Sequence, residues 1–303
     1  MKVFVAEPLS AEGLEVLRAE HEVNYRTGLT RDEFLAGLAE CDAVVVRSQM
    51  KVDAEAIKAG SRLRVIGRAG VGLDNIDVDS AHAAGITVVN APDATTAAVA
   101  ELTIGLMFAL ARRIAIGDGS LRQGEWRRSE LVGMELAGRT LGILGLGRIG
   151  LAVADRANAL GMTCVGNDPY ASEEVAAARA VRVVAMDELL AEADVVTLHV
   201  PLTGATRGML GAEQLARMKE GALLINVARG GVVDEAALAQ ALRDGGLGGA
   251  AIDVFENEPP IGSPLLDAPN TVLTPHLGAS TAEAQARVSV EVARRVLEAL
   301  AGP

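Results

Sequence analysis

The sequence predicts an α/β protein built from two doubly wound parallel-sheet domains, and two observations lead to that prediction. Short runs of Val, Ile and Leu alternate with Ala-rich amphipathic segments along nearly all of the 303 residues. This alternation is typical of parallel strands joined by crossover helices. Half of the chain is hydrophobic but only 2% is aromatic. The core must therefore be packed mainly from Ala, Val, Leu and Ile, which suits buried parallel strands.

The predicted strands are short apolar runs bounded by polar or turn residues. They are KVFVA, DAVVVR, RVIGR, ITVVN, TLGILG, TCVGND, DVVTLHV, ALLINVA, GAAID and TVLTPH. Amphipathic helices are expected between them, for example over 11–20, 31–40, 151–160 and 235–243. Residues 97–121 are predicted to form one long helix, because no proline interrupts the pattern.

The chain is expected to divide into two domains, since a strand-rich segment with its own glycine turn begins afresh at about residue 141. A last helix over 281–300 is followed by no further strand, so it could return to pack on the first domain. We therefore predict a discontinuous first domain, 1–92 with 283–303, and a second domain over 93–282.

Charge and composition exclude several classes of function. The formal net charge of −12 argues against nucleic acids and anionic membranes as partners, because both require a basic face. The most apolar stretch, 102–111, is too short to span a bilayer as a helix, and the first residues show no cleavable signal pattern. A cytoplasmic protein is expected. Cys41 and Cys164 lack metal or redox spacing, and the four histidines are scattered, so no metal is expected.

A glycine turn in TLGILGLGRIG has the spacing G-x-G-x-x-G, at Gly145, Gly147 and Gly150. A predicted strand precedes it, a predicted helix follows, and Asp168 ends the next strand, as a dinucleotide-binding turn requires. Gly145 allows the tight turn, Gly147 the approach of a pyrophosphate, and Gly150 close helix–strand packing. Asp168 would accept hydrogen bonds from the adenosine ribose and repel a 2′-phosphate, which favours NAD over NADP. A purely structural glycine turn is the alternative.

Three later strands end in residues suited to proton transfer and anion binding: Arg229, Glu258 and His276. His is the side chain tuned for acid–base work near neutral pH, and a carboxylate can hold its tautomer. An Arg can bind a substrate carboxylate and polarise a carbonyl. Each residue alone could equally be an ordinary surface side chain, but all three follow strands of the predicted second domain.

Four motifs of the sequence are distinctive: INVARGG, DVFENEPP, TPHLGAST and GRAGVGLDNID. Through these motifs the chain resembles the D-isomer-specific 2-hydroxyacid dehydrogenases. GRAGVGLDNID with PHLGAST favours the D-3-phosphoglycerate dehydrogenase branch of that family. The resemblance implies a flavodoxin-like substrate domain and a Rossmann NAD-binding domain. It also implies oxidation of D-3-phosphoglycerate to 3-phosphohydroxypyruvate for serine synthesis, with a phosphorylated hydroxy acid as the small-molecule partner. A homodimer or tetramer is expected, formed through residues 97–121.

The resemblance assigns roles to individual residues. His276 is implied as the acid–base, Glu258 as its partner, and Arg229 as the group on the substrate carboxylate and carbonyl. Substrate contacts are implied for Arg47, Ser48, Lys51, Arg68 and Gly70. Cofactor contacts, besides the three glycines, are implied for Arg148, Ile149, Asp168, Val200, Ala228, Asp253 and Gly278.

Two departures from the family pattern affect the choice of substrate. The usual RSATKV reads RSQMKV, and the usual NAPxGNT reads NAPDATT. A glyoxylate/hydroxypyruvate reductase, or a reductase of another D-2-hydroxyacid, is therefore the alternative enzyme. A non-catalytic NAD(H)-sensing interaction protein is a more remote alternative. Since the sequence ends before the regulatory modules of longer members, serine feedback through such a module is not expected.

Overall fold

The strands assemble into two parallel sheets in the computed structural model, which describes residues 1–302. Each sheet belongs to its own compact unit. The first unit contains residues 1–96 and the segment from Ala279 onward, and the second contains Ala97–Gly278. Within residues 1–302, no helix combines the length and apolar composition that crossing a membrane requires.

The sheet of the first unit has the strand order β2-β1-β3-β4-β5, with every neighbouring pair parallel. This is the flavodoxin-like order, in which the direction of winding reverses between β1 and β3. The strands are β1 (Lys2–Val5), β2 (Glu22–Tyr25), β3 (Ala43–Val46), β4 (Val65–Arg68) and β5 (Thr87–Asn90). The helices are α1 (Ala11–Arg18), α2 (Arg31–Leu38), α3 (Ala54–Ala59), α4 (Val78–Ala83) and the last helix of the chain, α12 (Ala282–Ala301).

Helix α12 is part of the core of the first unit. Its apolar stripe, Val288, Val292, Val296 and Leu300, is at most 3% exposed and packs with buried valines of β1, β3 and β4. Burial stabilises each of these side chains by about 1.5–3 kcal/mol. Gly67 in β4 makes the close approach possible, because a Cβ there would lie 2.5 Å from Val296 Cγ2.

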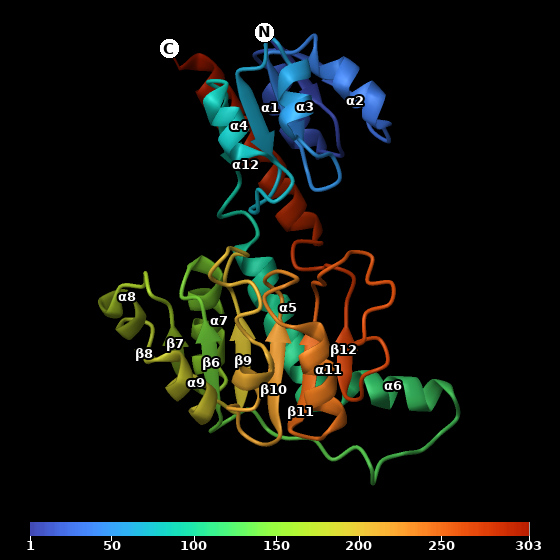
Figure 1. Ribbon diagram of the computed structural model, residues 1–303, viewed down its shortest axis with the longest axis vertical. Helices are drawn as coiled ribbons and strands as arrows, with labels where there is room; N and C mark the ends of the chain where they lie inside the picture. The colour runs from blue at the N-terminus through green and yellow to red at the C-terminus, as the bar shows by residue number, and fades with distance from the viewer. Residues whose placement is uncertain (303) are drawn as a thin grey trace. The chain divides into compact units, whose positions relative to one another are not determined.

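The sheet of the second unit has the order β12-β11-β10-β9-β6-β7-β8 and is also entirely parallel (Figure 1). Leaving out β12, this is the Rossmann order, which reverses between β6 and β9. The strands are β6 (Thr140–Leu144), β7 (Thr163–Asn167), β8 (Val181–Val183), β9 (Val195–Leu198), β10 (Ala222–Asn226), β11 (Leu247–Ile252) and β12 (Thr271–Leu273). The helices are α5 (Thr96–Ala111), α6 (Ile114–Arg122), α7 (Arg148–Ala159), α8 (Glu173–Ala177), α9 (Met186–Glu192), α10 (Ala212–Leu215) and α11 (Glu235–Arg243).

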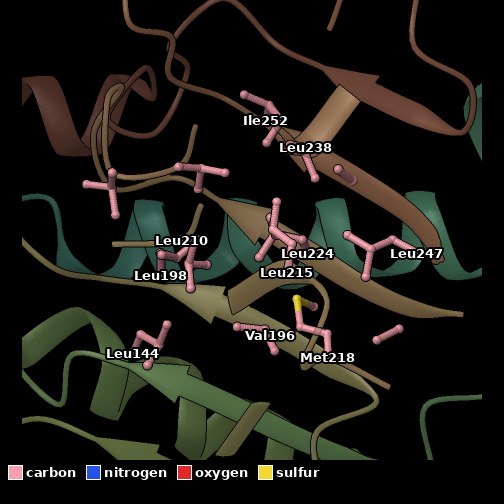
Figure 2. Packing of buried hydrophobic residues seen from close by; sticks show 14 of the residues in the cluster. Leu144, Val196, Leu198, Leu210, Leu215, Met218, Leu224, Leu238, Leu247 and Ile252 are labelled. Atoms are coloured by element: carbon pink, nitrogen blue, oxygen red, sulfur yellow. The ribbon is translucent and has the colours of Figure 1, made fainter. Parts of the chain in front are cut away.

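Aliphatic side chains fill the core of the second unit, as the low aromatic content predicts. Figure 2 shows Leu144, Val196, Leu224 and Ile252 among the buried residues that pack on one face of the sheet. The predicted α/β class with two doubly wound parallel sheets is thus confirmed.

Two details of the predicted secondary structure are wrong. Strands β2 and β8, each at an edge of its sheet, are absent from the prediction. The single long helix expected over 97–121 is two helices, α5 and α6. The break lies at Arg113, whose backbone is left-handed with φ of 53°. This conformation ends a right-handed helix without any proline.

Candidate active site

The glycine turn lies between β6 and α7, where the strand order of the second unit reverses. Ligands of open α/β sheets bind outside the strand ends at such a point. Gly145 has φ of 95°, and a Cβ there would lie 2.6 Å from the carbonyl oxygen of His199, just after β9. A Cβ at Gly150 would lie 2.0 Å from the carbonyl oxygen of Gly145. Both positions therefore require glycine for backbone packing.

Gly147 differs from the other two glycines because open space surrounds its Cα. Apart from Gly147 itself and its neighbours along the chain, no atom lies within 4 Å of the position that a Cβ would take. Gly147 is also the N-cap of α7, and no side chain caps this helix. The first N–H groups of a helix are left without intrahelical partners and favour anions. The turn thus fits a pyrophosphate, with Arg148, Ile149 and Gly150 in the first turn of the helix.

Asp168 follows β7 and lies against the same turn. Its Oδ2 accepts a hydrogen bond from the Leu146 N–H at 2.8 Å, and its Oδ1 accepts one from the Tyr170 N–H at 2.8 Å. A carboxylate has about four acceptor positions. The two backbone bonds orient Asp168 beside the glycine turn and leave acceptor capacity for ribose hydroxyls.

Arg229 lies in a turn after β10 that a buried side chain holds. Asn226, 2% exposed, donates from Nδ2 to the Arg229 carbonyl at 3.1 Å, and its Oδ1 accepts from the Ala228 N–H at 3.1 Å. The Arg229 guanidinium donates to the Ala228 carbonyl at 2.7 Å. Next along the chain, a Cβ at Gly230 would lie 1.8 Å from the Phe255 carbonyl oxygen. The Arg229 turn therefore touches the loop that follows β11.

Asp253 shapes the loop that carries His276. Its side chain is fully buried and accepts three hydrogen bonds: from Thr274 Oγ1 at 2.6 Å, the Leu277 N–H at 2.7 Å and the Gly278 N–H at 2.9 Å. The Asp253 carbonyl also accepts the His276 N–H at 2.9 Å. His276 itself has a left-handed backbone, with φ of 55°. Such a conformation is uncommon for a residue with a side chain and persists where its surroundings fix it.

His276 and Glu258 form a direct pair. The imidazole Nδ1 lies 2.8 Å from Glu258 Oε2 and 3.0 Å from Oε1. Because a carboxylate can only accept, Nδ1 carries the proton and Nε2 is the atom available for proton exchange with a substrate. Glu258 Oε1 also accepts the Phe255 N–H at 3.2 Å, which orients the carboxylate.

Glu235, the first residue of α11, anchors the loop that carries Glu258 through two hydrogen bonds. Its Oε1 accepts the Glu256 N–H at 2.7 Å, and its Oε2 accepts Ser263 Oγ at 2.5 Å. Glu235 also lines a hollow of about 430 Å³ beside this loop, with Arg207 and Asn257 among its other walls. Sequence reasoning missed both Asn226 and Glu235, because each acts through hydrogen bonds that form only in the folded chain.

The remaining predicted cofactor residues lie at the same edge of the second sheet. Val200 follows β9 and its Cγ1 borders Gly145, while Ala228 belongs to the Arg229 turn. A Cβ at Gly278 would lie 3.4 Å from Asp253 Oδ2. Across residues 1–302, no group of three or more His, Cys, Asp or Glu side chains could hold a metal ion.

The predicted substrate residues lie at or just after the carboxyl ends of strands of the first sheet. Arg47 directly follows β3 and Arg68 ends β4, the neighbouring parallel strand. Ser48 and Lys51 are exposed in the loop after β3. Gly70 has φ of 151°, and a Cβ there would lie 1.5 Å from the Arg68 guanidinium. The guanidinium therefore folds over Gly70, and a side chain at this position would displace it.

Known proteins similar to this chain include dehydrogenases that bind NAD, as the glycine turn and Asp168 indicate. Residues 104–278 match the family described as D-isomer specific 2-hydroxyacid dehydrogenase, NAD binding domain. The predicted cofactor, NAD, is thus confirmed.

Full-length similarities extend over both units. The D-3-phosphoglycerate dehydrogenase of Methanocaldococcus jannaschii is 50% identical over 303 residues, which are 100% of this chain and 58% of that protein. Among solved structures, the TT0316 protein from Thermus thermophilus is 38% identical with a TM-score of 0.91, covering 99% of this chain and 97% of that one. A glyoxylate reductase from Paecilomyes thermophila is 32% identical with a TM-score of 0.91, covering 99% and 95%.

The chain thus spans somewhat more than half the length of the curated relative that it matches. The predicted resemblance to the phosphoglycerate dehydrogenase branch is confirmed by that similarity. The matched domain and the full-length similarities show that the chain belongs to the D-isomer specific 2-hydroxyacid dehydrogenase family.

Proposed function

We propose that the protein is an NAD-dependent dehydrogenase that oxidises D-3-phosphoglycerate to 3-phosphohydroxypyruvate, the entry step of serine synthesis. The main support for this proposal is the His276–Glu258 pair. The pair lies at the carboxyl ends of the strands of the second sheet, as the glycine turn does. The similarity to the Methanocaldococcus jannaschii D-3-phosphoglycerate dehydrogenase supports the choice of substrate.

His276 is proposed as the base of the reaction. Oxidation of a hydroxy acid removes the hydroxyl proton and the C2 hydrogen, the latter as a hydride. When bound, NAD supplies the hydride acceptor. His276 Nε2 accepts the hydroxyl proton, and the Glu258 carboxylate at Nδ1 stabilises the imidazolium that results. In the reverse direction the same imidazolium returns the proton.

Arg229 is proposed to bind the substrate carboxylate and the oxygen that becomes the carbonyl. A guanidinium offers five N–H donors in a planar fork, which suits a carboxylate. Asn226 and the close packing at Gly230 fix the turn that carries this side chain. The second unit is thereby proposed to hold NAD and to carry out the proton transfer.

The first unit is proposed to bind the charged ends of the substrate. With a net charge of −12, the protein needs a local cationic cluster to bind a phosphorylated acid. Arg47, Lys51 and Arg68 supply three cations at the carboxyl ends of the strands of the first sheet, and Ser48 adds neutral donors. The Gly70 N–H already donates to the Arg68 carbonyl at 2.8 Å, so Gly70 is proposed to contribute by leaving room for the Arg68 guanidinium. Charge-assisted hydrogen bonds of this kind are the strong ones in phosphate recognition.

The test is NADH formation, followed by its absorbance, from a panel of D-3-phosphoglycerate, D-glycerate, D-lactate and 2-hydroxyglutarate, with NAD and NADP compared. We expect D-3-phosphoglycerate with NAD to give the highest kcat/KM, and Arg47→Ala to raise KM for this substrate. Turnover with NADP alone would contradict the role of Asp168. An unchanged KM in the Arg47→Ala variant would contradict the phosphate assignment.

Reduction of glyoxylate or hydroxypyruvate is the second candidate, and a specific observation favours it. Gln49 and Met50 replace the small residues usual in the loop after β3, and Ala94 and Thr95 replace Gly and Asn after β5. The Paecilomyes thermophila glyoxylate reductase shares the fold. Faster oxidation of NADH with glyoxylate than formation of NADH from D-3-phosphoglycerate would favour this candidate.

A homodimer formed through α5, α6 and the chain after them is part of the proposal. In Figure 1, α6 lies beyond the β12 edge of the second sheet. This segment exposes Ile114, Leu121, Trp126 and Val132, each more than half exposed. Apolar surface of this kind marks interaction sites. Light scattering after gel filtration tests the dimer, and a monomeric mass at micromolar concentration would contradict it.

A further inference from the structure

Glu7 is a buried carboxylate in the first unit to which the proposed reaction gives no role. It lies two residues after the end of β1, and only 4% of its surface is exposed. Strands β1 and β3 are neighbours at the point where the strand order of this sheet reverses. Ligands of doubly wound sheets bind outside the strand ends at such a point. Glu7 therefore lies next to the loop that begins with Arg47, since that loop follows the neighbouring strand β3.

Three backbone N–H groups of that loop donate to the Glu7 carboxylate. Oε2 accepts from Arg47 at 2.6 Å and from Met50 at 3.2 Å, and Oε1 accepts from Gln49 at 3.1 Å. Among the described residues, Glu7 forms no ion pair. A buried charge is costly unless hydrogen bonds replace its hydration, and here backbone donors of a single loop do so. This arrangement ties three backbone N–H groups of the loop to one side chain.

The carbonyl groups of the loop are held as well. Asn75 donates from Nδ2 to the Arg47 carbonyl at 3.0 Å and to the Met50 carbonyl at 2.6 Å. The Ser48 N–H, in contrast, donates no hydrogen bond to any residue in 1–302. The inner face of the loop is therefore occupied by Glu7 and Asn75. The Ser48 N–H and the Arg47 and Lys51 side chains remain for an anionic substrate.

We propose that Glu7 is the positioning residue of the substrate loop 47–51, and that it sets the affinity for the hydroxy acid without touching it. This inference rests on the proposed function only in taking the loop to bind the substrate. Replacing Glu7 by Gln keeps the size but removes the charge, and its amide nitrogen must face an N–H donor. The loop then loses at least one anchor, which should raise KM for the hydroxy acid.

Asp42 provides a matched control at the opposite end of the same strands. It is 9% exposed and directly precedes β3, and its carboxylate accepts the Lys2 N–H at 2.7 Å and the Arg62 guanidinium at 2.9 Å. Asp42→Asn thus replaces a comparable buried carboxylate at the start of β3, whereas the loop 47–51 follows the end of that strand. The two variants separate a general loss of stability from loss of loop geometry.

The experiment compares wild type, Glu7→Gln, Glu7→Asp and Asp42→Asn by steady-state kinetics and by hydrogen exchange of the peptide covering 47–51. In Glu7→Gln we expect KM for the hydroxy acid to rise by about tenfold, the factor equivalent to about 1.4 kcal/mol. We expect kcat to stay within about threefold and KM for NAD to stay unchanged, because NAD is held by the second unit. The loop amides should exchange faster. Glu7→Asp keeps the charge with a shorter reach and should show the same changes to a smaller degree.

Asp42→Asn should alter neither KM nor exchange in the loop. Unchanged loop exchange in both Glu7 variants would overturn the inference, as would an equal rise of KM in Asp42→Asn. If Glu7→Gln does not fold, Glu7→Asp decides by the same two readouts. Failure of wild type to oxidise D-3-phosphoglycerate would instead refute the proposed function. In that case the hydrogen exchange and the KM for whichever hydroxy acid is turned over still test Glu7.

Discussion

Replacing Glu258 by Gln is expected to slow hydride transfer by about 10- to 100-fold and to leave NAD binding unchanged. The Gln side chain can still accept the Nδ1–H of His276, which now lies 2.8 and 3.0 Å from the two carboxylate oxygens. It cannot, however, supply the negative charge that stabilises the imidazolium. The variant therefore tests the charge of the partner separately from the position of the ring.

The expected loss of rate follows from the distance and exposure of the His276–Glu258 pair. Two unit charges about 4 Å apart attract by about 1 kcal/mol in water and by about 4 kcal/mol at an effective dielectric constant near 20. His276 and Glu258 have side chains that are 51% and 40% exposed, so an intermediate value applies. About 1.4–2.7 kcal/mol corresponds to the range given above, at about 1.36 kcal/mol for each tenfold change.

Single-turnover formation of NADH in a stopped-flow instrument is the suitable assay, since it separates hydride transfer from NADH release. Glu256→Gln is the matched control, because Glu256 lies on the same exposed loop and, within residues 1–302, its side chain forms no hydrogen bond or ion pair with His276. This control should stay within about twofold of wild type. Hydride transfer in Glu258→Gln within twofold of wild type would refute the reasoning, and so would an equal loss in the control.

Three further predictions concern packing, thiol reactivity and the loop that carries Glu258. Gly67→Ala places a Cβ 2.5 Å from Val296 Cγ2 and should lower the free energy of unfolding by about 1–3 kcal/mol; an unchanged melting temperature would show that α12 can shift. Burial raises the pKa of the Cys41 thiol to about 12 and that of Cys164 to about 11, so neither should react with a disulfide reagent at pH 8 until the protein is unfolded; rapid reaction of the folded protein would count against their burial. Glu235→Ala removes two hydrogen bonds from the loop and should lower kcat roughly tenfold, whereas full activity would mean that the loop holds itself.

The buried strands could be predicted from the sequence because their apolar runs are long enough to stand out. Strand β2, in contrast, reads Glu-Val-Asn-Tyr and is mostly exposed, and β8 has only three residues. Each lies at an edge with one neighbouring strand, where pairing rather than burial defines the strand. The break between α5 and α6 depends on one left-handed residue, which leaves no clear mark in the sequence.

The same distinction applies to the site. Arg229, Glu258 and His276 could be proposed because each follows a predicted strand, and parallel strands end at one edge of the sheet. Glu7 and Asn226 could not, because their roles depend on hydrogen bonds that exist only after folding. Glu7 donates nothing and accepts from residues about 40 positions away. The one available signal was an acidic residue and a proline directly after the apolar run KVFVA.

The preference for phosphate is the most direct test of the proposed function. D-3-phosphoglycerate and D-glycerate differ only in the phosphoryl group, so the ratio of their kcat/KM values with NAD measures what the cations of the first unit contribute. Two charge-assisted hydrogen bonds at about 1.5–3 kcal/mol each predict a ratio above about 100 in favour of D-3-phosphoglycerate. A ratio near or below one would contradict the account.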